Sequence, residues 1–200
     1  MDIIQVEGYQ ITKLQSVAEG FCKALYVTYN SAFAHDGCEP WMHSGDEMAV
    51  MATNGCLSIE LYLKFLTVLA TYQDSTNQGE HLKTHDLIIL YNDLNQKGPT
   101  YISDIEKEYQ SIQHKGTTGT FKDFCDSVKE YFIEWRYAHT ASTLSLNLNT
   151  LSDVLNILDR YSENAFRSVS AKITKHPANW GTESMSIDLT DEIKKWNSIF

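Results

Sequence analysis

Arginine is the scarcest charged residue in this chain of 200 residues, present only as Arg136, Arg160 and Arg167. Lysine and arginine together number 16 against 26 aspartates and glutamates, which gives a formal net charge of −10. Proteins that neutralise nucleic-acid phosphates normally carry a surplus of basic residues. The composition therefore argues against strong generic DNA binding, although it leaves room for a local basic site.

Long apolar runs are also absent. No stretch of about 18 apolar residues occurs, so we expect no membrane-spanning helix. The first ten residues, MDIIQVEGYQ, lack the basic segment and apolar run of a signal peptide. The four cysteines, Cys22, Cys38, Cys56 and Cys125, form no CxxC pair. These features predict reduced thiols and a cytoplasmic location.

Proline and glycine, the residues that mark linkers, are few: three prolines and ten glycines. The chain shows no internal repeat, and 42% of its residues are hydrophobic, enough for a sizeable core. We therefore predict one domain over residues 1–173, with its core at about 47–170. A polar C-terminal tail over 174–200 is expected to contain a short docking helix.

The hydrophobic pattern is helical nearly throughout, because apolar residues recur at spacings of three and four. No alternating segment of useful length predicts a strand. The fold class is therefore expected to be all-α, a bundle of four to five helices with an additional, more exposed amphipathic helix at 100–113. The other predicted helices cover residues 11–33, 47–72, 86–95, 120–137 and 150–173.

The segment 47–72 is the most apolar of these helices. Apolar residues on nearly all its sides predict a central helix packed all round. Glu60 and Lys64 are the exceptions, four residues apart in the favourable order. Gly55 costs roughly 1 kcal/mol relative to alanine in a helix interior, so it indicates a close approach between helices.

Helix ends are signalled by local capping residues. Thr84 is expected to cap the helix at 86–95, and Gly98-Pro99 to stop it. Thr120 and Asp123 resemble a capping box, with aspartate in place of the usual glutamate. Thr150 and Asp153 repeat that signal, which predicts that the last long helix begins there.

Histidines cluster twice. The first group consists of His81, His85 and Asp86. Its spacing would place both imidazoles on one metal ion only if the residues formed a continuous helix, whereas the local sequence spans a loop and a helix start. A capping or packing role is therefore preferred over a metal-dependent enzyme, and we predict no bound metal or cofactor. The second group lies in a Gly/Pro loop at 34–46 and is interpreted as a solvated loop. Its members are His35, Asp36, Cys38 and His43.

The run Trp135-Arg136-Tyr137-Ala138-His139 carries the clearest chemistry. Arginine binds phosphate through two hydrogen bonds and histidine exchanges protons near neutral pH. Three residues apart on a helix, Arg136 and His139 share a face, and the two suffice for metal-free RNA cleavage. The structural alternative is an Arg136 salt bridge to a neighbouring helix and a histidine at a helix C-terminus. No GxSxG, Walker loop or GxGxxG motif offers a competing enzyme.

Three segments in order resemble the HEPN family of helical-bundle proteins. The segment from Asn54 to Lys64 contains Glu60-Leu-Tyr-Leu-Lys64, similar to the ELxLK core of that family's central helix. His85-Asp86-Leu87 is similar to the GHDL-like entry to its next helix, and Arg136-Tyr137 to the arginine-tyrosine of a later helix. The resemblance covers roughly residues 47 to 170.

The resemblance implies a bacterial cytoplasmic protein, often a homodimer across the helices that carry the arginine. Such proteins frequently serve in toxin–antitoxin, defence or stress systems, and many are metal-free ribonucleases that combine an arginine and a histidine from each subunit. It also implies a structural polar network of Glu60, Lys64, His85, Asp86 and Tyr137, with Arg136 beside it. RNA or a nucleotide is the ligand class expected from the family.

The family's nuclease signature, an arginine followed after four to six residues by histidine, is absent here. The corresponding window after Arg136 holds Ala141, Ser142 and Thr143, and His139 comes early, after two intervening residues. Because position 141 is alanine, the tyrosine modified by paired nucleotidyltransferases in some members is missing too. Two functions follow. The first is a dimeric component that is non-catalytic or catalytically atypical. The second is an active ribonuclease that uses Arg136 and His139 as its catalytic residues.

Overall fold

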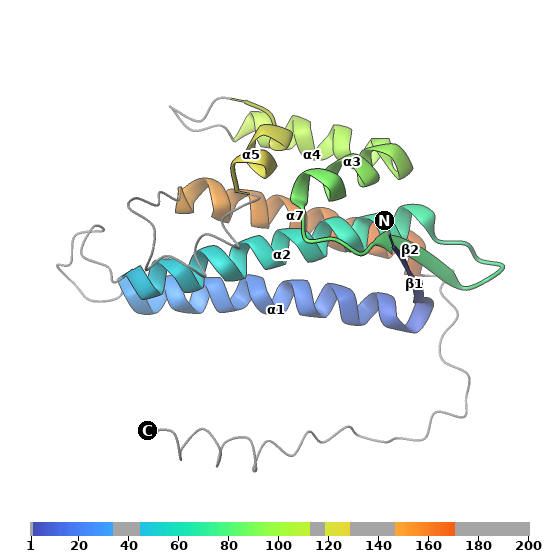
Figure 1. Cartoon of the computed structure of the whole chain (residues 1–200), viewed down its shortest axis with the longest axis horizontal. Helices are drawn as coiled ribbons and strands as arrows, with labels where there is room; N and C mark the ends of the chain where they lie inside the picture. The colour runs from blue at the N-terminus through green and yellow to red at the C-terminus, as the bar shows by residue number, and fades with distance from the viewer. Residues whose placement is uncertain (1, 34–44, 113–118, 129–146, 171–200) are drawn as a thin grey trace, which may run out of the picture.

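The computed structural model describes residues 2–33, 45–112, 119–128 and 147–170 (Figure 1). These residues form two strands and six helices, in good agreement with the mostly helical class that the sequence predicts. The strands are β1 (Ile3–Glu7) and β2 (Gln78–Leu82). The helices are α1 (Gly8–Phe33), α2 (Gly45–Thr71), α3 (Leu87–Lys97), α4 (Pro99–Ser111), α5 (Phe121–Val128) and α7 (Leu148–Ser170).

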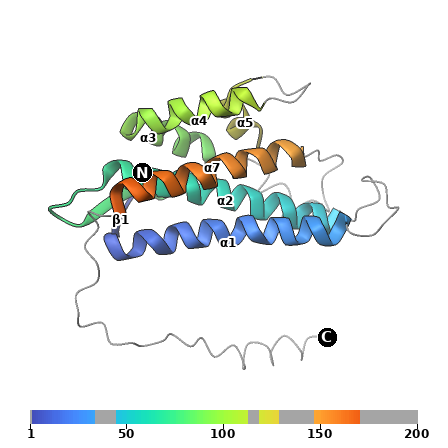
Figure 2. The ribbon, with the colours of Figure 1, turned by 180° about the vertical axis from the view of Figure 1, so that it is seen from behind.

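Helix α2 lies at the centre of the fold. It contacts α1, α3, α7 and β2, while α4 packs on α7 and α5 packs on α3 and α4. The two views in Figures 1 and 2 show α1 on one side of α2 and the short helices α3, α4 and α5 on the other. The described helices thus form three layers, with α2 and α7 in the middle.

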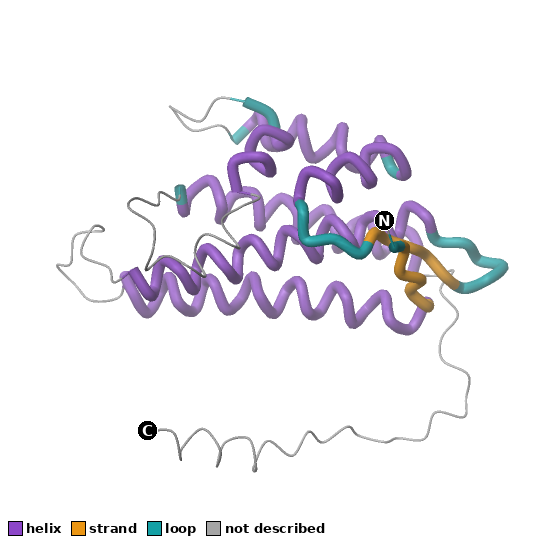
Figure 3. The backbone as a smooth tube through the Cα atoms, in the orientation of Figure 1, coloured by secondary structure: helices purple, strands orange, loops and turns teal. Residues whose placement is uncertain are grey.

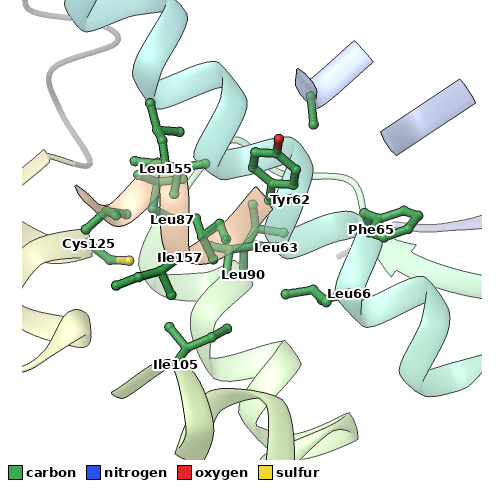
Figure 4. Packing of buried hydrophobic residues seen from close by; sticks show 14 of the residues in the cluster. Tyr62, Leu63, Phe65, Leu66, Leu87, Leu90, Ile105, Cys125, Leu155 and Ile157 are labelled. Atoms are coloured by element: carbon green, nitrogen blue, oxygen red, sulfur yellow. The ribbon is translucent and has the colours of Figure 1, made fainter. Parts of the chain in front are cut away.

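The core follows from this placement. Ten apolar side chains of α2 are between 0% and 4% exposed because neighbours cover several sides of the helix, as the sequence predicts. They are Met51, Ala52, Cys56, Ile59, Tyr62, Leu63, Phe65, Leu66, Val68 and Leu69. Figure 4 shows four of them, Tyr62, Leu63, Phe65 and Leu66, together with core residues from α3, α4, α5 and α7, among them Leu90, Ile105, Cys125 and Leu155. One continuous cluster of buried residues therefore joins all three layers.

Gly55 marks the close approach that its position in α2 predicts. A Cβ atom placed there would lie 2.6 Å from Leu151 of α7 and 2.9 Å from Leu25 of α1. Any larger residue would push against both neighbouring helices at once. The glycine therefore sets how closely α1 and α7 pack against the N-terminal half of α2.

A two-stranded antiparallel sheet lies at one end of the helices (Figure 3). The register pairs Ile3 with Leu82 and Glu7 with Gln78. The prediction that the chain contains no strand is therefore wrong. The strands are five residues each and lie far apart in the chain, so neither produces a local hydrophobic pattern long enough to recognise.

Two of the predicted caps also need correction. Asp86, not Thr84, caps α3, since its Oδ1 accepts from Ile88 N (2.9 Å) and Ile89 N (3.1 Å). Asn147, not Thr150, caps α7 by accepting from Thr150 N at 3.1 Å. In both cases a side chain with the better capping geometry stands two or three residues from the predicted one.

The capping box at α5 and the stop between α3 and α4 are confirmed. Asp123 N donates to Thr120 Oγ1 (3.1 Å), and Thr120 N donates to Asp123 Oδ2 (2.7 Å). Gly98 ends α3 with its N–H on Leu94 O, and Pro99 then begins α4. The predicted continuation of α5 to 137 and the tail over 174–200 lie outside the described residues.

Within the described parts of the chain, no helix combines the length and apolar character needed to span a membrane.

Replacing Gly79 by alanine is expected to destabilise the fold. A Cβ atom in β2 at this position would lie 2.3 Å from the main-chain oxygen of Val68 in α2, which cannot move as a side chain can. Overpacking of this kind typically costs about 1–3 kcal/mol. Thermal unfolding should therefore show a lower Tm for Gly79→Ala.

Gly20→Ala is the matched control. Nothing lies within 4 Å of a Cβ atom at this site on α1, so the change should stabilise the helix by up to about 1 kcal/mol. Equal Tm values for Gly79→Ala and Gly20→Ala would contradict the close contact between β2 and α2.

Candidate functional site

A buried ion pair lies at the middle of α2. Lys64 Nζ is 2.6 Å from Glu60 Oε1, with only 9% and 6% of the two side chains exposed. The four-residue spacing places both on one face of the helix. That face is covered by the segment leading from β2 into α3, so the pair is enclosed by the fold.

His85 joins this pair from the segment before α3. Its Nδ1 lies 3.1 Å from Glu60 Oε1 and 3.0 Å from Glu60 Oε2. The imidazole is 74% exposed, whereas the carboxylate that holds it is buried. Residues 25 positions apart in the sequence are thereby locked together. We call Glu60, Lys64 and His85 the α2 polar cluster.

Asp86, the next residue, has a capping role, as the sequence analysis prefers for this group. Its carboxylate caps α3, and its own N–H donates to Thr84 Oγ1 at 3.1 Å. Among the described residues, Asp86 thus fixes the helix start rather than compensating Lys64. Since it directly follows His85, its cap also positions that imidazole.

A second chain of polar contacts connects α3 to the sheet. Lys97 Nζ lies 3.1 Å from Asp93 Oδ1 and 3.2 Å from Glu80 Oε1. Gln5 Nε2 of β1 donates to Glu80 Oε2 at 3.0 Å. These contacts fix the sheet against α3, close to where the α2 polar cluster is held.

His81 does not join His85 in a metal site. It lies in β2 and is buried, with its Nδ1 2.9 Å from Leu82 O. Burial lowers the pKa of His81, and the carbonyl of Leu82 only partly offsets that effect. In the described part of the chain, no three side chains of the metal-binding types come together. The second histidine group, within residues 34–46, falls outside it.

A cavity of about 380 Å³ opens between α1 and α7, over Tyr62 of α2. The Tyr62 hydroxyl donates to Asp159 Oδ1 at 2.6 Å, and burial raises its pKa. Tyr26 spans the same groove, with its hydroxyl 3.0 Å from Asn156 Oδ1. These contacts join α7 to α2 through Tyr62 and to α1 through Tyr26.

The described cysteines are not suited to nucleophilic chemistry. Cys22, Cys56 and Cys125 are buried and unpaired with each other. Burial raises the pKa of Cys22 to about 11 and that of Cys56 to about 12. Since the thiolate is the reactive form, these three residues behave as small core side chains at neutral pH.

Glu106 is a structural residue that sequence reasoning misses. From α4 it accepts Phe121 N at 2.7 Å and the Tyr91 hydroxyl at 2.9 Å. One carboxylate thus holds the start of α5 and the side of α3. No local signal could have found it, because a glutamate in an exposed amphipathic helix is usually solvated.

Of the predicted site residues, the structure brings together Glu60, Lys64 and His85. Arg136, Tyr137 and His139 lie outside the described residues, so their place relative to the α2 polar cluster is not part of the observed geometry. Chemically, the cluster presents an oriented, exposed imidazole supported by a buried carboxylate. Such a group can exchange a proton or bind an anion, and the same contacts tie the helices together.

Comparison with known proteins finds no family model, no curated protein and no solved structure that matches this chain.

The α2 polar cluster predicts large losses from single substitutions. Lys64→Met leaves the Glu60 carboxylate buried without its ammonium partner, and Glu60→Gln leaves the ammonium without its carboxylate. Breaking a buried pair from one side typically costs about 3–5 kcal/mol. Denaturant unfolding should show that Glu60→Gln/Lys64→Met together lose less than the sum of the two single losses. Strictly additive losses would mean that the two groups do not interact.

Burial of His81 predicts a pH dependence of stability. Burial lowers the pKa of His81 in the folded state, whereas in the unfolded chain the imidazole keeps its ordinary pKa of about 6.5. Around and below this pH the unfolded chain therefore binds more protons than the folded chain. The free energy of unfolding should therefore fall as the pH drops from 7.5 to 5.5. The variant His81→Gln should show a flatter profile over this window. Parallel profiles would contradict the assigned effect of burial.

Proposed function

We propose that this chain is a HEPN-like helical protein that acts as a dimeric binding component of a bacterial defence, toxin–antitoxin or stress system. In this role the ribonuclease chemistry of the family is lost or altered. The dimer, the cytoplasmic location and an RNA or nucleotide ligand are parts of this proposal, taken from the resemblance in the sequence.

The observation that supports the proposal is the α2 polar cluster. Two of the three segments that carry the resemblance contribute its residues: Glu60 and Lys64 come from the first, and His85 comes from the second. The two segments meet at the Glu60 carboxylate, which is what the resemblance leads us to expect. Their contact through buried charge makes the motifs one physical unit.

Two features favour binding over catalysis. The first is that the family's Arg–His spacing is absent. The cluster itself resembles a device that holds helices together, because its carboxylate and ammonium groups are buried against each other. A protein that recognises a partner needs such a rigid frame and no reactive centre.

The alternative is a metal-free endoribonuclease that uses Arg136 to hold the scissile phosphate and His139 as general acid or base. The observation that favours it is the run Trp135-Arg136-Tyr137-Ala138-His139, in which both residue types occur at helical spacing. Both functions require Arg136, one as an ion-pair partner and the other as a catalytic group.

Cleavage of RNA in EDTA separates the two. The purified protein would be incubated with total RNA and with a tRNA pool, beside Arg136→Ala and His139→Ala. The control is Arg160→Ala, which removes an exposed arginine that pairs with Glu108 on α4. For a binding component we expect no cleavage by the parent, with light scattering to show that it is a folded dimer.

Cleavage by the parent and by Arg160→Ala, lost in the other two variants, would overturn the binding role and establish the nuclease. A folded monomer without cleavage would contradict the dimeric form of the proposal. A role of Arg136 in the frame predicts, in addition, that Arg136→Ala melts several degrees below Arg160→Ala.

A further inference from the structure

The pairing of β1 with β2 determines which main-chain groups of β1 point outward. Gly8 N donates to Asn77 O, and Lys83 N donates to Asp2 O, both at 2.8 Å. In an antiparallel ladder the hydrogen-bonded pairs alternate. The even-numbered residues of β1 therefore bond to β2, whereas Ile3, Gln5 and Glu7 direct their N–H and C=O groups to the opposite edge.

The far edge of β2 is already closed by the end of α2. Glu80 N donates to Thr71 Oγ1 at 2.8 Å, and the same hydroxyl lies 3.1 Å from Glu80 O. Gln73 N donates to Gln78 O at 2.9 Å. The sheet can therefore grow on one side only, at β1.

The outer edge of β1 is open at two residues. Glu7 N is occupied, since it donates to Gln10 Oε1 at 3.1 Å. No main-chain or side-chain partner from the described residues reaches the N–H or C=O groups of Ile3 and Gln5 on this edge. Two donors and two acceptors, at alternate positions of one strand, are thus without a partner among the described residues.

This edge lacks several of the usual protections against strand pairing. Its sequence, Ile-Ile-Gln-Val-Glu, contains no lysine or proline, and its pairing with β2 runs without a bulge. Ile3 and Ile4 are 53% and 38% exposed, two of only five large apolar side chains that are exposed in the described residues. Apolar surface and open hydrogen-bonding groups therefore coincide.

We propose that the open edge of β1 pairs with β1 of a second copy of the chain, antiparallel about a two-fold axis at Ile4. Ile3 and Gln5 then exchange N–H···O bonds with Gln5 and Ile3 of the other copy. All four open groups of each strand are satisfied, and the two small sheets become one sheet of four strands. Ile4 stands on the axis, where it covers its own exposed surface.

A second copy fits this edge better than an unrelated strand because the open groups match one another. In the register centred on Ile4, each open N–H of one copy faces an open C=O of the other. A register centred on Gln5 would require Glu7 N, which Gln10 already occupies. In the register centred on Ile4, Asp2 faces Val6, so no carboxylate lies directly opposite another. This interface is independent of the proposed function, whose dimer uses the helix that carries Arg136.

A cysteine at the axis tests the register directly. Opposed residues in a non-hydrogen-bonded pair have Cα atoms about 4.5 Å apart, within the range that a disulfide spans. Ile4→Cys should therefore form a covalent dimer under mild oxidation. Ile3→Cys is the control, because its two copies would be offset by two residues, roughly 7 Å along the strand. The parent, which keeps its own cysteines, measures background oxidation.

The open N–H group of Gln5 gives a second test by sedimentation over a range of concentrations. Gln5→Pro removes the outward main-chain N–H of residue 5, and proline is tolerated on an edge strand when that N–H faces away from the sheet. Gln5→Ala keeps the N–H but, like proline, loses the bond to Glu80. We expect the dimer dissociation constant of Gln5→Pro to be about tenfold higher than that of Gln5→Ala, because each dimer loses two hydrogen bonds.

The proposal is overturned if the parent, without an N-terminal tag, stays monomeric at every concentration. It is also overturned if Ile4→Cys gives no more covalent dimer than Ile3→Cys, or if Gln5→Pro dimerises as well as Gln5→Ala. Dimerisation that Gln5→Pro leaves intact would assign the contact to another surface, such as the helix of Arg136. A chain that stays monomeric while its β1 edge binds an unrelated strand would likewise refute pairing with a second copy.

Discussion

The carboxylate of Glu60 lies on α2, the central helix of the described fold, with the ammonium of Lys64 at 2.6 Å. Because α2 is packed against helices on several sides and against β2, these two charges have little access to water. They must therefore compensate each other inside the fold. Glu60 also holds His85, and this contact restricts the conformation of the loop that leads into α3.

The layers follow from how α2 is used. Gly55 lets α1 and α7 approach one half of the helix, and the polar cluster fixes the entry to α3 over the other half. Glu106 then carries the arrangement outward, since its carboxylate binds both Tyr91 of α3 and the start of α5. Few of these contacts are at the surface, so the frame depends on buried polar groups as well as on apolar packing.

Most of the helices could be predicted from the sequence because a period of three to four residues is a local signal. The sheet could not, since β1 and β2 each depend on a partner more than seventy positions away. Cap residues were predicted less well for another reason. Thr84 and Asp86 both have side chains able to cap α3, and only the path of the chain decides between them.

The candidate site divides in the same way. The contact of Glu60 with Lys64 follows from helical spacing, and that with His85 from the order of the motifs. By contrast, the pairing of Tyr62 with Asp159 joins residues 97 positions apart, which no pattern in a single sequence predicts. Arg136 and His139 stay predictions, because they lie outside the described residues.

The sheet also has a consequence for synthesis on the ribosome. β1 is translated before β2, so Gln5 must wait for Glu80, 75 residues later. At about 5–20 residues per second, the strand and its exposed isoleucines are without their partner for roughly 4–15 s. Helix α1 is complete early in that interval, and α2 ends nine residues before Glu80. β1 is therefore expected to find its partner strand only after both of these long helices have been translated.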